Sequence, residues 1–204
     1  MEHIRLFRNE WLERLTQISF SGFVAIWCMV LSLMVWTNWG IVDVVPAVLL
    51  VVAGFLTWLP FEYAMHRGLF HWESQSPMIR KLVFLMHENH HASPNDRMRN
   101  LMPPVVSLPI AAAIWLGSVA LLGPAAAWAA LGFVIGYVVY DIAHYACHQW
   151  PMKSRFGMMF KRHHMRHHHV TPHGNFAITA LFLDRMLRTR IASAQARREV
   201  QKTP

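Results

Sequence analysis

The sequence has very little cysteine. Among its 204 residues only Cys28 and Cys147 are cysteines, and neither has a second cysteine near it at the spacing of a metal-ligand pair. This excludes a disulfide framework and a zinc site built from clustered thiolates, so we expect both thiols to serve packing. The chain length fits a single domain covering residues 1–204.

Charge is also missing over long stretches of the chain. No Asp, Glu, Lys or Arg occurs in residues 15–42, 44–61 and 100–140. A membrane span needs about 20 apolar residues, so the last stretch is long enough for two spans, and Gly123-Pro124 divides it. We therefore predict an all-α integral membrane protein with four transmembrane helices, near residues 16–36, 42–60, 104–122 and 125–146.

The placement of the basic residues indicates an orientation. The turns within the first and second pairs of spans are short, which predicts two helical hairpins, and all 19 Lys and Arg lie on the side opposite those turns. By the positive-inside rule this side is cytoplasmic, with both termini and the segments 61–100 and 147–184 on it. The net charge of +8 is explained by topology and anionic lipid head groups, so no nucleic-acid partner is expected. We expect the bacterial inner membrane rather than the endoplasmic reticulum.

Histidine is the residue that this chain has in excess. There are 14, of which His3 is expected at the surface, and ten fall into four boxes on the predicted cytoplasmic side. The boxes are His66 and His71; His87, His90 and His91; His144 and His148; His164, His167 and His168. At 100° per residue, each H-x-x-H-H box places three rings on one helix face. His66 and His71 are five apart and would point about 140° away from each other on a straight helix. Gly68 between them would permit a bend that brings them together; the simpler alternative is that they serve different metal ions.

Ten imidazoles on a helical cytoplasmic cap are too many for one ion and fit two, with four or five nitrogen ligands each. Imidazole binds iron, copper, nickel and zinc, whereas a structural zinc site needs only four ligands and favours cysteine. The pattern therefore favours two reactive metals that act on O2, and the nearby bilayer favours a lipid chain as substrate. A metal store, a transporter and a haem protein fit the fixed boxes less well.

The four boxes resemble those of the fatty acid hydroxylase and sterol desaturase superfamily of membrane di-iron enzymes. The resemblance covers about residues 55–180 and lies in EYAMHRGLFHW, FLMHENHHASP, YDIAHYACHQW and KRHHMRHHHV. It is greatest to the fatty acid 2-hydroxylase branch, and it implies that the ten box histidines bind two iron ions, which zinc can replace in purified protein. The implied reaction is O2-dependent hydroxylation of a fatty acyl chain at carbon 2.

The alternative within the same di-iron class is a carotenoid or sterol-type hydroxylase or desaturase. Bacterial carotenoid hydroxylases share the first two boxes, but their third box has four intervening residues where this chain has three. Members of the 2-hydroxylase branch often carry a fused cytochrome b5 domain, whereas here only about 15 residues precede the first predicted span. We therefore expect a separate electron donor, a ferredoxin or a cytochrome b5-like protein, docked on the basic face.

Two acidic residues are candidates to support the metal ligands. Asp141 lies three residues before His144, and Glu62 lies four before His66, so each could accept the second ring N–H of a metal-bound histidine. Glu88 is expected to point away from His87. Five further residues have weaker expectations: Tyr140 and Tyr145 as hydrogen-bond partners near the metals, and His163, His169 and His173 as solvated rings or rings behind the ligands.

Overall fold

The computed structural model describes residues 4–192, and every regular element among them is helical. Four helices are long and apolar enough to cross a membrane, which confirms the predicted four-span helical architecture. They are α2 (Phe20–Asn38), α3 (Val44–Met65) with its extension η1 (His66–Phe70), α6 (Pro104–Leu122) and α7 (Ala126–Gln149). His3 lies outside the described residues, and the single-domain organisation stays a prediction.

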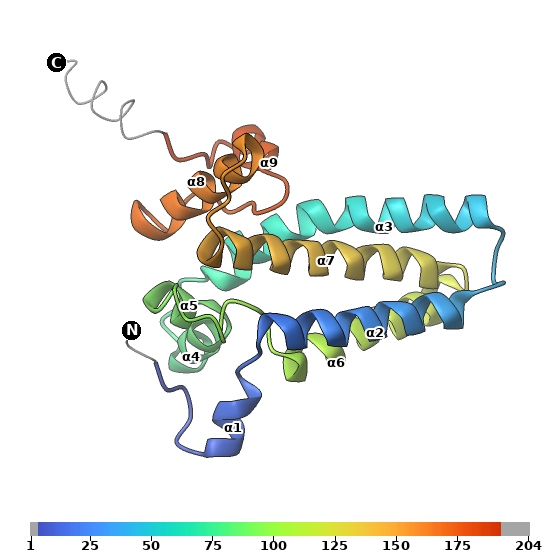
Figure 1. The fold of residues 1–204 in the computed structure, drawn as a ribbon, viewed down its shortest axis with the longest axis horizontal. Helices are drawn as coiled ribbons and strands as arrows, with labels where there is room; N and C mark the ends of the chain where they lie inside the picture. Colours follow the sequence, from blue (N-terminus) through green and yellow to red (C-terminus); the bar gives the residue numbers. More distant parts are fainter. Residues whose placement is uncertain (1–3, 193–204) are drawn as a thin grey trace.

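The remaining helices gather at one end of the four-helix bundle, and the turns of both hairpins lie at the other end (Figure 1). These helices are α1 (Glu10–Leu15), α4 (Pro77–Val83), η2 (Phe84–Glu88), α5 (Asn89–Ala92), α8 (Arg155–His169) and α9 (Phe182–Met186). Their starts follow local signals: Asn9 and Ser154 cap α1 and α8 through their side chains, and Pro77 opens α4. The second span runs well past the predicted end at residue 60, because α3 continues directly into η1.

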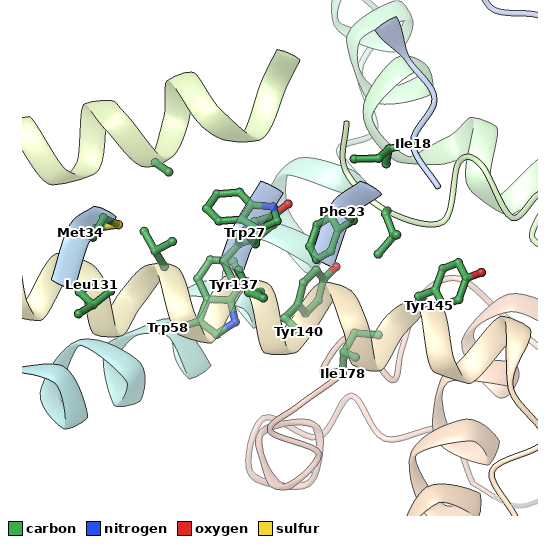
Figure 2. Close-up of a cluster of buried hydrophobic side chains, with 14 of the residues drawn as sticks. Ile18, Phe23, Trp27, Met34, Trp58, Leu131, Tyr137, Tyr140, Tyr145 and Ile178 are labelled. Atoms are coloured by element: carbon green, nitrogen blue, oxygen red, sulfur yellow. The ribbon is translucent and has the colours of Figure 1, made fainter. Parts of the chain in front are cut away.

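Helix α7 lies at the centre of the bundle. Of its apolar stretch 67% is buried, against 11–17% for the other three spans, so the other three turn most of their surface outward. Aromatic rings pack around it: the Tyr137 ring lies 5.2 Å from that of Trp27 and 5.7 Å from that of Trp58 (Figure 2). Such edge-to-face contacts fix the register of α2 and α3 on α7.

Two glycines let α3 and α7 approach each other very closely. A Cβ atom on Gly54 would lie 1.9 Å from the carbonyl oxygen of Ala129, and one on Gly132 would lie 1.9 Å from that of Val51. No larger residue fits at either position, and small residues of this kind are typical of close helix crossings in membranes. The crossing matters for the site because α3 and α7 each carry histidines at the same end of the bundle.

Candidate metal centre

The ten box histidines converge in two clusters of five. In each cluster one ring nitrogen from every residue lies within 4.8 Å of the others. The first cluster is His66, His71, His87, His91 and His167, and the second is His90, His144, His148, His164 and His168. The boxes thus come together as the topology led us to expect, with five nitrogens for each potential ion.

Of the two alternatives for His66 and His71, the simpler one, that they serve different ions, is wrong. Both belong to the first cluster, with ring centroids 5.1 Å apart. The reason is that residues His66–Phe70 form a π-helix, whose turn joins residues i and i+5 rather than i and i+4. Two histidines five apart therefore share a face here, whereas the straight α-helix assumed from the sequence would separate them.

Each H-x-x-H-H box is divided between the two clusters. In the second box His87 and His91, four apart, join the first cluster, while His90 turns to the second. In the fourth box the assignment is reversed: His167 joins the first cluster and its two neighbours in the box join the second. Each box thus contributes to both clusters, and the two clusters lie side by side, with the His91 and His168 rings stacked at 4.1 Å.

Hydrogen bonds fix which ring nitrogen faces the first cluster. The Nδ1–H of His66 donates to the carbonyl of Phe176 at 2.5 Å, and the Nδ1–H of His167 donates to that of Gly174 at 2.8 Å. In a neutral ring Nε2 then carries a lone pair. The Nε2 atom of His167 lies only 3.0 Å from that of His71 and 3.1 Å from that of His91, so nitrogens of several rings converge around this lone pair. This donor set therefore fits a metal ion.

The second cluster has the same arrangement. The Nδ1–H of His144 donates to the carbonyl of Asn100 at 3.0 Å, and its buried Nε2 has no hydrogen-bond partner among the described residues. The Nε2 atoms of His148 and His164 lie 2.8 Å apart. A buried, unpartnered nitrogen aimed at four others is what a metal ligand requires.

Glu62 supports the first cluster indirectly. The expected contact with a histidine ring is not formed. Its buried carboxylate accepts hydrogen bonds from the indole N–H of Trp58 at 3.0 Å, from the backbone N–H groups of Ile178 and Thr179 at 3.0 and 2.8 Å, and from the Thr179 hydroxyl. These bonds hold the 174–179 loop, whose Phe176 carbonyl in turn holds His66.

Asp184 holds the same loop from its other side. Its carboxylate accepts from the backbone N–H groups of Phe176 and Ala177 at 2.9 and 2.8 Å, and from the Nε2–H of His163 at 2.9 Å. Burial alone would raise the pKa of Asp184, but these bonds and one from Thr189 lower it overall. His163 therefore lies behind the ligands, one of the two roles expected for it.

The 174–179 loop contains a further residue that the sequence did not identify. Asn175 has a φ of 55°, in the left-handed region, which asparagine tolerates better than most residues. Its side-chain N–H donates to the carbonyl of His163 at 2.8 Å, and its side-chain oxygen accepts from the backbone N–H of Ile191 at 2.7 Å. These contacts orient the carbonyls on either side of it toward the metal-facing rings.

Asp141 supports the second cluster indirectly, as Glu62 supports the first, by binding a backbone segment that holds a histidine ring. It does not contact His144 as expected; it accepts from the backbone N–H of Met102 at 2.9 Å and from the Tyr137 hydroxyl at 3.0 Å. This fixes the segment that presents the Asn100 carbonyl to His144. The two clusters share this arrangement. In each, a buried carboxylate one helical turn before a histidine binds a neighbouring segment, and a backbone carbonyl of that segment accepts a hydrogen bond from the histidine ring.

Asn100 and Asn89 were not predicted as site residues. The Asn100 side chain donates to the carbonyl of Pro94 at 2.9 Å and accepts from Gln149 at 2.5 Å, so it ties three segments together beside the second cluster. The Asn89 side chain donates to the carbonyls of Phe84 and Leu85 at 2.8 and 2.9 Å, at the start of the π-helix η2. No periodic pattern marks residues that act through backbone groups.

The other residues considered from the sequence lie outside the clusters. Glu88, His169 and His173 are exposed, and the His173 ring lies 3.8 Å from the carboxylate of Glu73. Tyr140 is buried with its ring stacked 6.2 Å from that of His144, and Tyr145 stacks on Phe20.

Burial keeps the clustered rings neutral. It lowers the pKa of His71, His91 and His167 to about 3, helped by the neighbouring rings. The pKa values of four further rings outside the spans are shifted in the same direction by the same causes; these are His87, His90, His164 and His168. Neutral imidazole is the form that binds a metal, so the rings stay available as ligands well below pH 7.

A largely apolar cavity of about 620 Å³ leads to both clusters. It reaches His87 of the first cluster and His90 and His144 of the second. Helices α3, α6 and α7 form its walls within the bundle, and α1 and α4 cover it at the histidine-bearing end. Among its lining residues Val105 and Ile110 of α6 are each 50% exposed, so this wall borders the surrounding bilayer.

Four apolar spans capped by two clusters of buried and half-buried histidines define a helical membrane protein with a histidine-rich metal site. Comparison with known families gives the more particular assignment. Residues 51–189 match the model of the fatty acid hydroxylase family, and the chain belongs to this family. It is therefore an oxidoreductase.

Individual relatives agree with this assignment. The chain is 33% identical over 195 residues to the dihydroceramide fatty acyl 2-hydroxylase FAH2 of Arabidopsis thaliana, covering 93% of this chain and 81% of the relative. It is 29% identical to the fatty acid 2-hydroxylase of Rattus norvegicus, covering 92% of this chain and 57% of the relative. Among solved structures it is similar to full-length scs7p, of which only the hydroxylase domain is visible, with a TM-score of 0.82, 29% identity, and coverage of 91% of this chain and 71% of that one.

Proposed function

We propose that this protein hydroxylates the acyl chain of a membrane lipid at carbon 2, with O2 as oxidant and two iron ions as cofactor. The observation that carries the proposal is the apolar cavity, which ends on rings from both histidine clusters. An acyl chain in that cavity has its reactive carbon beside the metal-facing nitrogens, and an apolar wall surrounds the rest. The relatives named for acyl 2-hydroxylation support carbon 2 as the position.

The ten box histidines are the proposed ligands, five for each ion. When bound, two iron ions in nitrogen ligands supply the capacity to activate O2 for attack on a C–H bond. The overall reaction converts one C–H bond, O2, two electrons and two protons into C–OH and water. Zinc is expected to occupy the same nitrogens in protein purified without added iron, since imidazole accepts both metals.

The two electrons are proposed to come from a separate one-electron donor protein, a ferredoxin or a cytochrome b5-like protein. The Lys and Arg of the described residues all lie outside the hairpin turns, at the end of the bundle that carries the histidines. A basic surface of this kind favours docking of an acidic partner. By the positive-inside rule the same charges support a cytoplasmic location for this end. The relatives reported above are eukaryotic, so a bacterial inner membrane stays a prediction.

The proposal is tested by lipid mass spectrometry of cells that express the protein under ¹⁸O2. We expect one ¹⁸O in lipid acyl chains with the wild type, located at carbon 2 by fragmentation, and none with His167→Ala, which removes a ligand of the first cluster. His173→Ala is the matched control, because this histidine is exposed and outside both clusters.

Three results would contradict the proposal. Unlabelled acyl chains in wild-type cells that also express donor proteins would exclude an acyl hydroxylase, and labelled carotenoids or sterols in the same cells would identify the alternative substrate class. Labelled product from His167→Ala at the wild-type level would contradict the ligand assignment.

A further inference from the structure

The cavity of about 620 Å³ that is proposed to hold the acyl chain is called the acyl cavity below. A second hollow lies on the other side of α3 from it. It has a volume of about 500 Å³ and is formed by α3 and η1 on one side and by α9 on the other. Pro60, Ala64 and Arg67 line it from the first wall, and Leu183 and Leu187 from the second. No histidine lines it, so it is separate from the site described above.

The residues that line the hollow change from apolar to cationic along the axis of α3 and η1. Pro60, Ala64 and Arg67 are spaced at i, i+4 and i+7, so they lie on one face of a helix. A rise of 1.5 Å per residue places Arg67 about 10 Å nearer the histidine-bearing end than Pro60. The hollow is therefore apolar toward the middle of the bilayer and cationic at the level where lipid head groups lie.

The cation in this hollow is available for a ligand. Arg67 is exposed, and none of the ion pairs among the described residues involves it. Its guanidinium donates one hydrogen bond, at 3.2 Å, to the hydroxyl of Tyr63. Tyr63 is only 5% exposed and in turn donates to the Thr189 hydroxyl at 2.9 Å. A buried phenol thus orients the arginine at the mouth of the hollow.

Helix α9 has the surface of a segment that lies on a membrane. Phe182 is 54% exposed, Met186 69% and Leu187 49%, while Asp184 on the opposite face is fully buried. Arg185 in the same helix is also exposed, and a short helix with exposed apolar and basic side chains, next to the end of a span, is suited to the bilayer interface. The hollow between α9 and α3 is therefore open to lipid rather than to water alone.

We propose that this hollow is a binding site for one anionic phospholipid. The phosphate lies against Arg67, and one acyl chain runs along Pro60 and Ala64 beneath Leu183 and Leu187. Basic pockets at the ends of spans bind anionic head groups in this way, and each cation contributes about 1 kcal/mol near a membrane surface. The lipid fills the space between α3 and α9 and so fastens α9, whose Asp184 holds the 174–179 loop, to the bundle.

The test is native mass spectrometry of the protein in a non-ionic detergent, titrated with phosphatidylglycerol or phosphatidylcholine of the same acyl chains. We expect the wild type to bind phosphatidylglycerol more tightly than phosphatidylcholine. Arg67→Gln should weaken phosphatidylglycerol binding about five-fold, which corresponds to the loss of about 1 kcal/mol. Arg80→Gln is the matched control, since Arg80 is exposed on α4, outside the hollow, and carries the same charge. Circular dichroism verifies that both variants remain folded.

The competing occupants give different results. Equal affinity for the two lipids in the wild type, or equal weakening by both arginine substitutions, would overturn the proposal. Displacement of the lipid by millimolar inorganic phosphate would show a free-anion site instead, and a dimer that excludes lipid from the hollow would show a second copy as its occupant. None of these readouts uses hydroxylase activity, so failure of the proposed reaction would leave this test unaffected.

Discussion

At the scale of single residues, the metal-facing rings are held by neutral groups. His66, His144 and His167 each donate Nδ1–H to a backbone carbonyl, and the buried acids bind the loops that supply those carbonyls. A carbonyl fixes the ring's tautomer and orientation without adding negative charge beside the ion. Each cluster thus offers neutral nitrogen donors, and an ion held by them would keep its full positive charge.

The two clusters should be separable by substitution of one supporting acid. Asp184→Asn replaces an acceptor of four hydrogen bonds by an amide, and two of those bonds hold the loop behind His66 and His167. We expect metal affinity of the first cluster to fall about 10- to 100-fold, the usual cost of losing such a partner. The second cluster should keep its ion, so metal content after dialysis against a chelator should fall from two ions toward one per chain.

Glu88→Gln is the control for this substitution, because Glu88 is an exposed acid within the second box. It should retain both ions under the same dialysis. Loss of both ions in parallel from Asp184→Asn would show that Asp184 supports the fold as a whole rather than one cluster.

At the scale of elements, a buried carboxylate on α1, that of Glu13, helps to attach this helix to the body of the protein. Glu13 accepts hydrogen bonds from the backbone N–H groups of Leu6 and Phe7 at 3.0 and 2.9 Å and pairs with the guanidinium of Arg99. Arg99 also donates to the Thr16 hydroxyl at 2.9 Å. Residues between 6 and 16 line part of the cavity proposed for the acyl chain, so the bonds of Glu13 hold a segment of the cavity wall.

The attachment of α1 should weaken in acid. Burial would raise the pKa of Glu13, but the bonds from Phe7, Arg99 and Leu6 outweigh it and lower the pKa. A carboxyl with a lowered pKa stabilises the folded state above its ordinary value of 4.5 and loses that contribution as pH falls through the lowered value. Glu13→Gln should mimic the acid form at neutral pH and reduce the hydrogen-exchange protection of residues 6–16 about ten-fold, because bonds to a charged group are lost.

The matched control is Glu10→Gln, whose acid is exposed and pairs with the exposed Arg5. Its exchange protection over residues 6–16 should stay within about two-fold of wild type. If Glu13→Gln behaves like this control, the carboxylate does not hold α1.

The helices and loops also show which features of the structure could be predicted from the sequence. The four spans and the ten histidines could be predicted because hydropathy and the spacing of identical residues are local patterns. The π-helical turn after Met65 could not be predicted, since its i+5 geometry depends on how α3 ends against the other helices. Asn100, Asn175 and Asp184 could not either, because they act on backbone groups that only the folded chain brings within reach.

At the scale of the whole molecule, the acyl cavity should limit which chains are accepted. Ala111 is buried and lines the cavity within α6. Ala111→Phe places a phenyl ring in the path of the chain, and we expect kcat/KM for long acyl chains to fall about ten-fold or more, since one misplaced group in an apolar pocket has effects of this size. Product formation from chains of graded length provides the measurement.

Ala113→Phe is the control for this prediction, because Ala113 lies on the same helix but is exposed and outside the cavity. It should leave the chain-length profile unchanged. If kcat/KM of Ala111→Phe equals that of the wild type at every chain length, the substrate does not extend past α6.

The distribution of histidines along the chain sets the order in which the site can be assembled. Helix α8 supplies His167 to the first cluster and His164 and His168 to the second, so neither cluster is complete until nearly the whole chain has been made. At about 5–20 residues per second, the ribosome needs roughly 5–20 s to proceed from His66 to His167. All four spans, the last of which ends at Gln149, are made before α8 begins at Arg155, so metal capture is expected to be a late event that follows synthesis of the spans. A nascent chain stalled before residue 164 would carry seven of the ten histidines and neither complete site.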